Sequence, residues 1–160
     1  MTNEDPLVSL QIGAAVVTWV VVTGFVLYLA HINAALGVQV PAFSALAVIN
    51  LVTTLLACLD RHIRLRRRQF LHALGGVAVL GAGWVAPVSF MPIYTIVWLA
   101  VACSLYPPRV LWWLLFGMVG AWYGVMRLAW EDSVTSALIS AVLYGTFHLF
   151  ALREVSSANR

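Results

Sequence analysis

The sequence contains no lysine, and only 9% of its 160 residues are charged, against roughly a quarter in an ordinary soluble domain. Hydrophobic residues make up 62% of the chain. A soluble domain of this size buries only about two-thirds of the surface of its unfolded chain, so this composition would leave large apolar patches in water. The scarcity of charge therefore excludes an ordinary soluble domain and predicts a protein whose surface faces lipid.

Ionised side chains are also missing from the middle of every long apolar segment. Proton relays, voltage sensors and ion-coupled transporters keep such groups inside the membrane in spite of their cost. The sequence also offers no Ser-His-Asp set, carboxylate pair or Gly-rich phosphate loop at one membrane depth. These absences argue against those transport classes, an intramembrane protease and a lipid transferase. We expect no catalytic residue and no cofactor.

Six mostly apolar segments approach or reach the roughly 20 residues that a helix needs to cross a bilayer. Pro87 and Pro92 separate the third segment from the short fourth, because proline interrupts a helix; a five-span chain would merge the two. The predicted fold class is all-α: a polytopic membrane protein with one six-helix transmembrane bundle in residues 1–152. The predicted spans are residues 9–31, 42–59, 70–86, 92–106, 109–130 and 134–152.

Nine arginines supply all the basic charge, and eight of them fall in three short polar stretches between or after the apolar segments. Cytoplasmic loops of membrane proteins are enriched in arginine, so these stretches predict that both termini are cytoplasmic (N-in/C-in). We therefore expect these arginines to contact anionic lipid headgroups and not nucleic acid. The eight residues are Arg61, Arg64, Arg66, Arg67, Arg68, Arg109, Arg153 and Arg160.

Four residues in the predicted membrane core carry hydrogen-bonding groups that lipid cannot satisfy. Asn50 is the most polar of them and needs a partner in another helix or across a dimer. Trp19, Trp98 and Trp122 fall near mid-depth, where an indole N–H also needs an acceptor. We favour packing inside the bundle for all four, with contact to a hydrophobic ligand as the alternative.

Two stripes of small residues occur at helix-packing spacing, one in the fifth segment and one in the sixth. Small residues let helix backbones approach closely in lipid. We expect both stripes to pack within one chain, with an interface between subunits as the alternative. The stripes consist of Gly117, Gly120 and Gly124, and of Ala137, Ala141 and Gly145.

Cys58, His72, Cys103 and His148 lie on four different segments, each within a turn or two of the predicted cytoplasmic boundary. Thiolate and imidazole ligands suit zinc or copper, and two histidines on separate helices can hold a haem. A local pair such as C-x-x-C or H-x-x-x-H is missing. We therefore expect buried reduced cysteines and ordinary interfacial histidines, with a metal or redox centre as a minor alternative.

Two stretches near the C-terminus, PIYTIVWLAVACSLYPPRVLWWLLFGMVGAWYGV and FHLFALREVSSANR, combine a Pro-Pro-Arg hairpin, a Trp-rich helix and a last span that runs into a polar helix. The C-terminal part of about 70 residues that contains these stretches resembles the N-terminal membrane domain of bacterial sensor histidine kinases of the DesK/NarX-like class. In that class residues 153–160 would begin a cytoplasmic signalling helix. The rest of the chain resembles the class only in its six-span pattern.

The resemblance implies a membrane-embedded signal-input domain of a two-component sensor histidine kinase. Such a domain relays a membrane or hydrophobic-ligand signal through its last helix to a cytoplasmic kinase. It also implies a location in the bacterial inner (cytoplasmic) membrane and a homodimer, with a kinase module and a response regulator as partners in the full-length protein. The phospho-accepting histidine and the ATP-binding domain are not among these residues, so we expect a truncation before the catalytic part. The alternative is a substrate-binding membrane subunit of a transporter.

Overall fold

The computed structural model describes residues 6–59 and 64–158, which form six α-helices, one 3-10 turn and no strand. The all-α prediction is confirmed, and each predicted segment falls on one helix. The elements are α1 (Pro6–Ile32), η1 (Ala34–Leu36), α2 (Val40–Leu59), α3 (Leu65–Val85), α4 (Ile93–Leu105), α5 (Pro108–Leu128) and α6 (Val134–Ala158).

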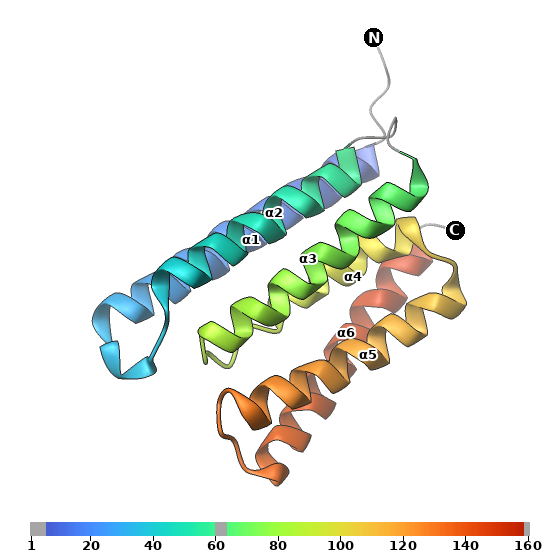
Figure 1. Ribbon diagram of the computed structural model, residues 1–160. Coiled ribbons are helices and arrows are strands. Elements are labelled where there is room, and N and C mark those ends of the chain that lie inside the picture. Colours follow the sequence, from blue (N-terminus) through green and yellow to red (C-terminus); the bar gives the residue numbers. More distant parts are fainter. Residues whose placement is uncertain (1–5, 60–63, 159–160) are drawn as a thin grey trace.

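The helices form two layers of three (Figure 1). One layer contains α2, α3 and α5, and the other contains α1, α4 and α6, with α3 and α4 in the two central positions. Helix α4 contacts each of the other five helices, whereas α1 contacts only α2, α4 and η1 within the described residues. The centre of the bundle is therefore α4, although it is the shortest α-helix.

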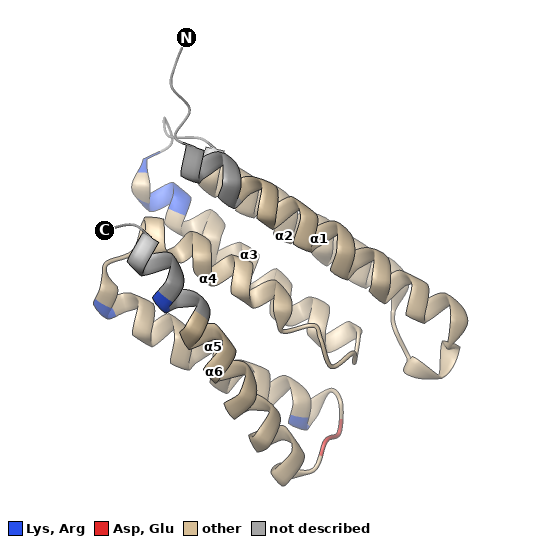
Figure 2. Ribbon diagram, turned by 180° about the vertical axis from the view of Figure 1, so that it is seen from behind, with Lys and Arg blue, Asp and Glu red and all other residues tan. Residues whose placement is uncertain are grey.

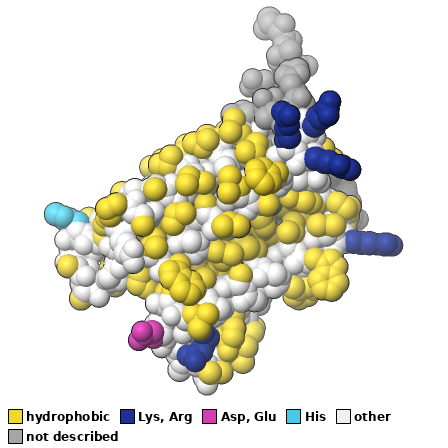
Figure 3. Space-filling view, in the orientation of Figure 1, with side chains coloured by type: hydrophobic (Ala, Val, Ile, Leu, Met, Phe, Trp, Pro, Cys, Tyr) yellow, Lys and Arg dark blue, Asp and Glu magenta, His cyan; other side chains and the backbone are white. Residues whose placement is uncertain are grey.

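Apolar side chains cover the outside of the bundle, and polar side chains are found inside it. Trp113, Phe116 and Leu128 are 63–77% exposed, and Figure 3 shows hydrophobic side chains spread over the visible face. The buried polar residues are Thr23, Asn50, Thr53, Thr54, His72, Thr95 and His148. The apolar outer surface fits a bilayer, because a soluble protein rarely exposes such large apolar areas.

Within the part of the chain that the structure describes, three helical segments are long and apolar enough to cross a membrane, namely Ile12–Ile32, Val40–Cys58 and Pro108–Leu128. The apolar parts of two others, Ile93–Leu105 and Val134–Phe150, are shorter. Helix α3 carries three arginines in its first turn, which lower its hydropathy. The observed helices therefore support a membrane protein.

Arginines gather at one end of the bundle, which we call the arginine end (Figure 2). We predicted that the whole stretch after α2 is a connection, but α3 already begins at Leu65. Arg66, Arg67 and Arg68 therefore lie on the first turn of a helix, where the helix dipole disfavours positive charge. Part of this cost is offset because Arg68 Nε donates to the Ala57 carbonyl in the last turn of α2, at 2.7 Å.

The connection between α3 and α4, residues 86–92, is irregular yet largely buried. Ala86 and Met91 are fully buried, the ring of Phe90 lies 5.0 Å from that of Phe25 on α1, and the Tyr144 hydroxyl on α6 donates to the Ser89 carbonyl. Irregular backbone is tolerated at membrane depth only where protein surrounds it. Like α4, the connection is therefore surrounded by other helices, and it lies at the end of the bundle opposite the arginines.

Glycines of α3, and not those of α5, make room for bulky side chains of neighbouring helices. A Cβ added at Gly76 would lie 2.8 Å from the Trp98 ring, and one added at Gly83 would lie 2.5 Å from the Trp122 ring. These glycines make room for the two indoles, because no larger residue allows such close approach.

The predicted packing of the α5 stripe within the chain is wrong: a Cβ added at Gly117, Gly120 or Gly124 meets nothing within 4 Å. The expectation failed because spacing shows that three residues share a helix face, but not which way that face points. The α6 stripe does pack inward, since Ala137 and Ala141 are buried and Gly145 lies against Val119.

Candidate functional site

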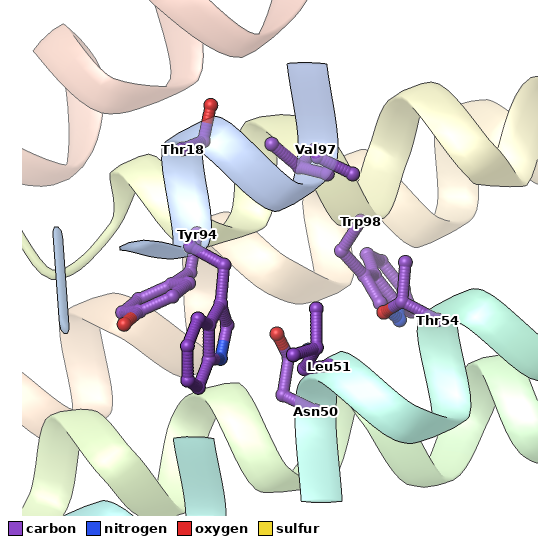
Figure 4. Close-up of a pocket in the computed structure, with 9 residues that line it drawn as sticks. Thr18, Asn50, Leu51, Thr54, Tyr94, Val97 and Trp98 are labelled. Carbon is purple, nitrogen blue, oxygen red and sulfur yellow. The ribbon is translucent and has the colours of Figure 1, made fainter. Parts of the chain in front are cut away.

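A small pocket lies between α1, α2 and α4, near the middle of α1 and α2 and in the N-terminal half of α4 (Figure 4). Its volume is about 10 Å³, close to the minimum that holds one water molecule. Each of the three helices contributes three residues from one turn. They are Ala15, Thr18 and Trp19 on α1, Asn50, Leu51 and Thr54 on α2, and Tyr94, Val97 and Trp98 on α4.

The spacing of the lining residues explains why these three helices build a pocket. Residues three or four positions apart share one helix face, and the pattern i, i+3, i+4 recurs on α1 and on α4. None of the nine lining residues is an acid, an arginine or a histidine. The pocket can therefore accept or donate hydrogen bonds and stack against an apolar group, but it carries no charge with which to hold an ion.

Hydrogen bonds to neighbouring helices fix the walls of the pocket. Trp19 Nε1 donates to the Ala47 carbonyl on α2 at 2.7 Å. Asn50 Nδ2 donates to the Gly75 carbonyl on α3 at 3.1 Å, so the partner expected for Asn50 in another helix is a backbone oxygen. The Tyr94 hydroxyl shares a hydrogen bond with Thr23 on α1.

Trp98 also lines the pocket and is held by a reciprocal pair of hydrogen bonds with α3. Its Nε1 donates to the His72 carbonyl at 2.6 Å, and His72 Nε2 bonds to the Trp98 carbonyl at 2.8 Å. The two rings stack with centroids 4.2 Å apart. Because both side chains are buried, a change in the position of Trp98 requires a change in α3.

Of the four core residues that we predicted, three line this pocket: Asn50, Trp19 and Trp98. Trp122 does not. It is 1% exposed and lies on the α5 side of α4, where its Nε1 donates to Thr95 Oγ1 at 2.8 Å. All three indoles therefore have an acceptor inside the bundle.

Sequence reasoning missed the polar residues Thr18 and Tyr94 and the role of Thr54. Thr54 differs from its neighbour Thr53, whose hydroxyl donates to the Ile49 carbonyl of its own helix at 2.7 Å. The recurring i, i+3, i+4 pattern with Trp19 and Trp98 is the signal that would have indicated Thr18 and Tyr94.

The four metal candidates do not form a cluster. His72 stacks on Trp98, His148 Nδ1 bonds to the Tyr144 carbonyl one turn earlier, and Cys58 and Cys103 are half-buried free thiols. In the described part of the chain, no group of three or more His, Cys, Asp or Glu side chains is placed to hold a metal ion.

The predicted headgroup arginines are exposed at the arginine end, apart from Arg68, which is half-buried. Arg64, Arg66 and Arg67 surround the start of α3, and Arg109 lies in the first turn of α5. Arg61 and Arg160 lie outside the described residues. No family model matches this sequence, and no curated protein or solved structure is significantly similar to it.

Proposed function

We propose that the chain is a six-span domain of the bacterial inner membrane, with both termini in the cytoplasm. Exposed arginines at one end of the bundle support this orientation, because arginine is enriched on the cytoplasmic side. Helix α4 has only 13 residues, about 20 Å of helix, which is less than the roughly 30 Å hydrocarbon core. Its central position and the buried connection before it make the short length acceptable in lipid.

The bundle is, in this proposal, the signal-input domain of a two-component sensor histidine kinase. The observation that carries the proposal is the connection between the pocket and α6 through α4. Helix α4 lines the pocket through Tyr94, Val97 and Trp98 and also contacts α6. Helix α6 then continues unbroken from Val134 past Arg153 to Ala158, so movement at its membrane-embedded part reaches the cytoplasmic side as movement of one rigid element.

The mechanism follows from these contacts. A signal that changes packing between α1, α2 and α4 shifts α4, and α4 shifts α6 because the two helices pack against each other. Packed interfaces favour discrete arrangements over continuous deformation, so the last helix passes on a two-state output. A homodimer, which the resemblance implies, converts that output into altered contacts between two kinase modules. A pocket of about 10 Å³ gives no specific support to the alternative, a substrate-binding transporter subunit.

The proposal is tested by joining a dimeric histidine kinase core to α6 after Arg160, with zero to seven helix-forming residues inserted at the junction. Autophosphorylation in membranes should rise and fall with a period of about 3.5 residues, because each insertion rotates the core relative to α6. A four-glycine insertion is the control and should remove the periodicity. Equal activity at every insertion length would contradict the relay through α6.

A second measurement concerns the native gene. The reading frame beyond the codon for Arg160 should encode heptad-spaced apolar residues and a histidine-bearing helix. A reading frame that encodes neither would refute the kinase assignment.

A further inference from the structure

Asn50 and Thr54 both line the pocket and are more than nine-tenths buried, and Asn50 Oδ1 and Thr54 Oγ1 have no hydrogen-bond partner among the described residues. The Asn50 side chain uses Nδ2 to reach Gly75, and its Oδ1 points into the space between the helices (Figure 4). Thr54 is 6% exposed and Asn50 is 7% exposed. A buried polar atom without a partner is costly, and more so where lipid replaces water.

The positions of the two residues allow one bound group to reach both oxygens. Asn50 and Thr54 are four residues apart on α2, so their side chains are neighbours on one helix face. A carboxamide oxygen only accepts hydrogen bonds, whereas a threonine hydroxyl both donates and accepts. The complementary group is an O–H, which donates to Asn50 Oδ1 and accepts from Thr54 Oγ1.

The size of the pocket limits what enters it. A volume of about 10 Å³ holds one oxygen-sized group. On the α1 side the walls Thr18 and Trp19 are only half-buried, so an apolar tail can leave the pocket toward the lipid.

We propose that the pocket binds a single hydroxyl group between Asn50 Oδ1 and Thr54 Oγ1, carried either by a water molecule or by a small membrane-soluble alcohol. This inference rests on the proposed function, and it names the class of ligand that the pocket binds. Its test measures binding alone, so its failure and the failure of the kinase relay are separate results.

Water is tested by solid-state NMR of the isotope-labelled chain in lipid bilayers, using magnetisation transfer from water to side chains. We expect transfer to the Asn50 amide and the Thr54 hydroxyl at mid-membrane depth. We expect none at Thr53, whose hydroxyl bonds the Ile49 carbonyl. Thr54→Val keeps the side-chain shape and should abolish transfer to Asn50, whereas Thr54→Ser should restore it and Thr53→Val should leave it unchanged.

The alcohol is tested by titrating bilayer samples with hexan-1-ol and, as control, heptane, while following tryptophan fluorescence and the water transfer signal. Saturable quenching by hexan-1-ol alone, with loss of the water signal, assigns the site to an alcohol. Thr54→Val should then weaken binding about fivefold, as expected for one lost hydrogen bond. A water signal without a saturable alcohol response assigns the site to water. Absence of both signals in the folded protein would overturn the proposal.

Discussion

At Gly83 the Trp122 ring lies so close that an added Cβ would meet it at 2.5 Å, whereas an added Cβ at Gly120 meets nothing within 4 Å. Glycine therefore has a packing role on α3 that it does not have on α5. On α3 the missing side chain is the space that a buried indole occupies. On α5 the glycine faces outward, and no atom of the described residues lies close enough to restrict its size.

This difference gives a prediction for a matched pair of substitutions. Gly83→Ala should lower the free energy of unfolding by about 1–3 kcal/mol, because a well-packed interior must shift to admit a methyl group. Gly120→Ala should change it by less than about 0.5 kcal/mol. Reversible unfolding in mixed micelles, followed by circular dichroism, measures both. Equal losses from the two variants would show that Trp122 does not pack on α3 as described.

The side chains that needed a partner were predictable, and the partners were not. A buried amide at Asn50 or an indole at Trp98 must find a hydrogen bond, whatever the fold. Which carbonyl accepts it depends on the rotation of each helix about its axis. Segments that are apolar on every side carry little information about that rotation, because the usual amphipathic pattern is absent.

Helix α4 and the connection before it show what decides the length of an element. Pro92 and the Pro107–Pro108 pair bracket the helix, so its short length was readable from the sequence. Its place at the centre of the bundle was not readable, because its contacts with five other helices depend on how those helices pack as well. The start of α3 was predicted too late in the sequence, because arginines can occupy a helix turn when that turn lies outside the hydrocarbon.

The burial of residues 86–92 predicts unusual protection for an irregular segment. Backbone amides of Val88 and Met91 donate to Ala86 and Val88 at 2.8 and 2.9 Å, and protein surrounds them. In hydrogen exchange of the chain in lipid nanodiscs, a peptide covering residues 86–92 should exchange at least about tenfold more slowly than one covering the exposed turn η1. Faster exchange in residues 86–92 than in η1 would contradict the described packing.

The whole molecule separates charge from hydrocarbon along its long axis. The other described arginines lie at one end, while Arg127 in the last turn of α5, and Glu131 and Asp132 in the connection to α6, lie at the other end. The number of helices and this asymmetry were predictable, because they rest on segment length and charge position. The two-layer arrangement was not predictable, because the sequence alone does not show which antiparallel helices pack against one another.

The proposed orientation predicts which residues are reached from outside the cell. In a chain with Cys58→Ala and Cys103→Ala, a single cysteine at Leu36→Cys or Ser133→Cys should react with an impermeant maleimide in intact cells. Leu65→Cys, beside the arginines, should react only after the membrane is permeabilised. Labelling of Leu65→Cys in intact cells would reverse the topology and remove the basis for a cytoplasmic output.

The central position of α4 also affects how substitutions combine. Energetic effects add when two sites share no partner, and they fail to add when both act on a common neighbour. Thr23 on α1, His72 on α3 and Trp122 on α5 belong to different helices, yet each bonds to α4. Epistasis between distant helices is therefore built into this architecture, and pairwise substitution scans will find it centred on the 13 residues of α4.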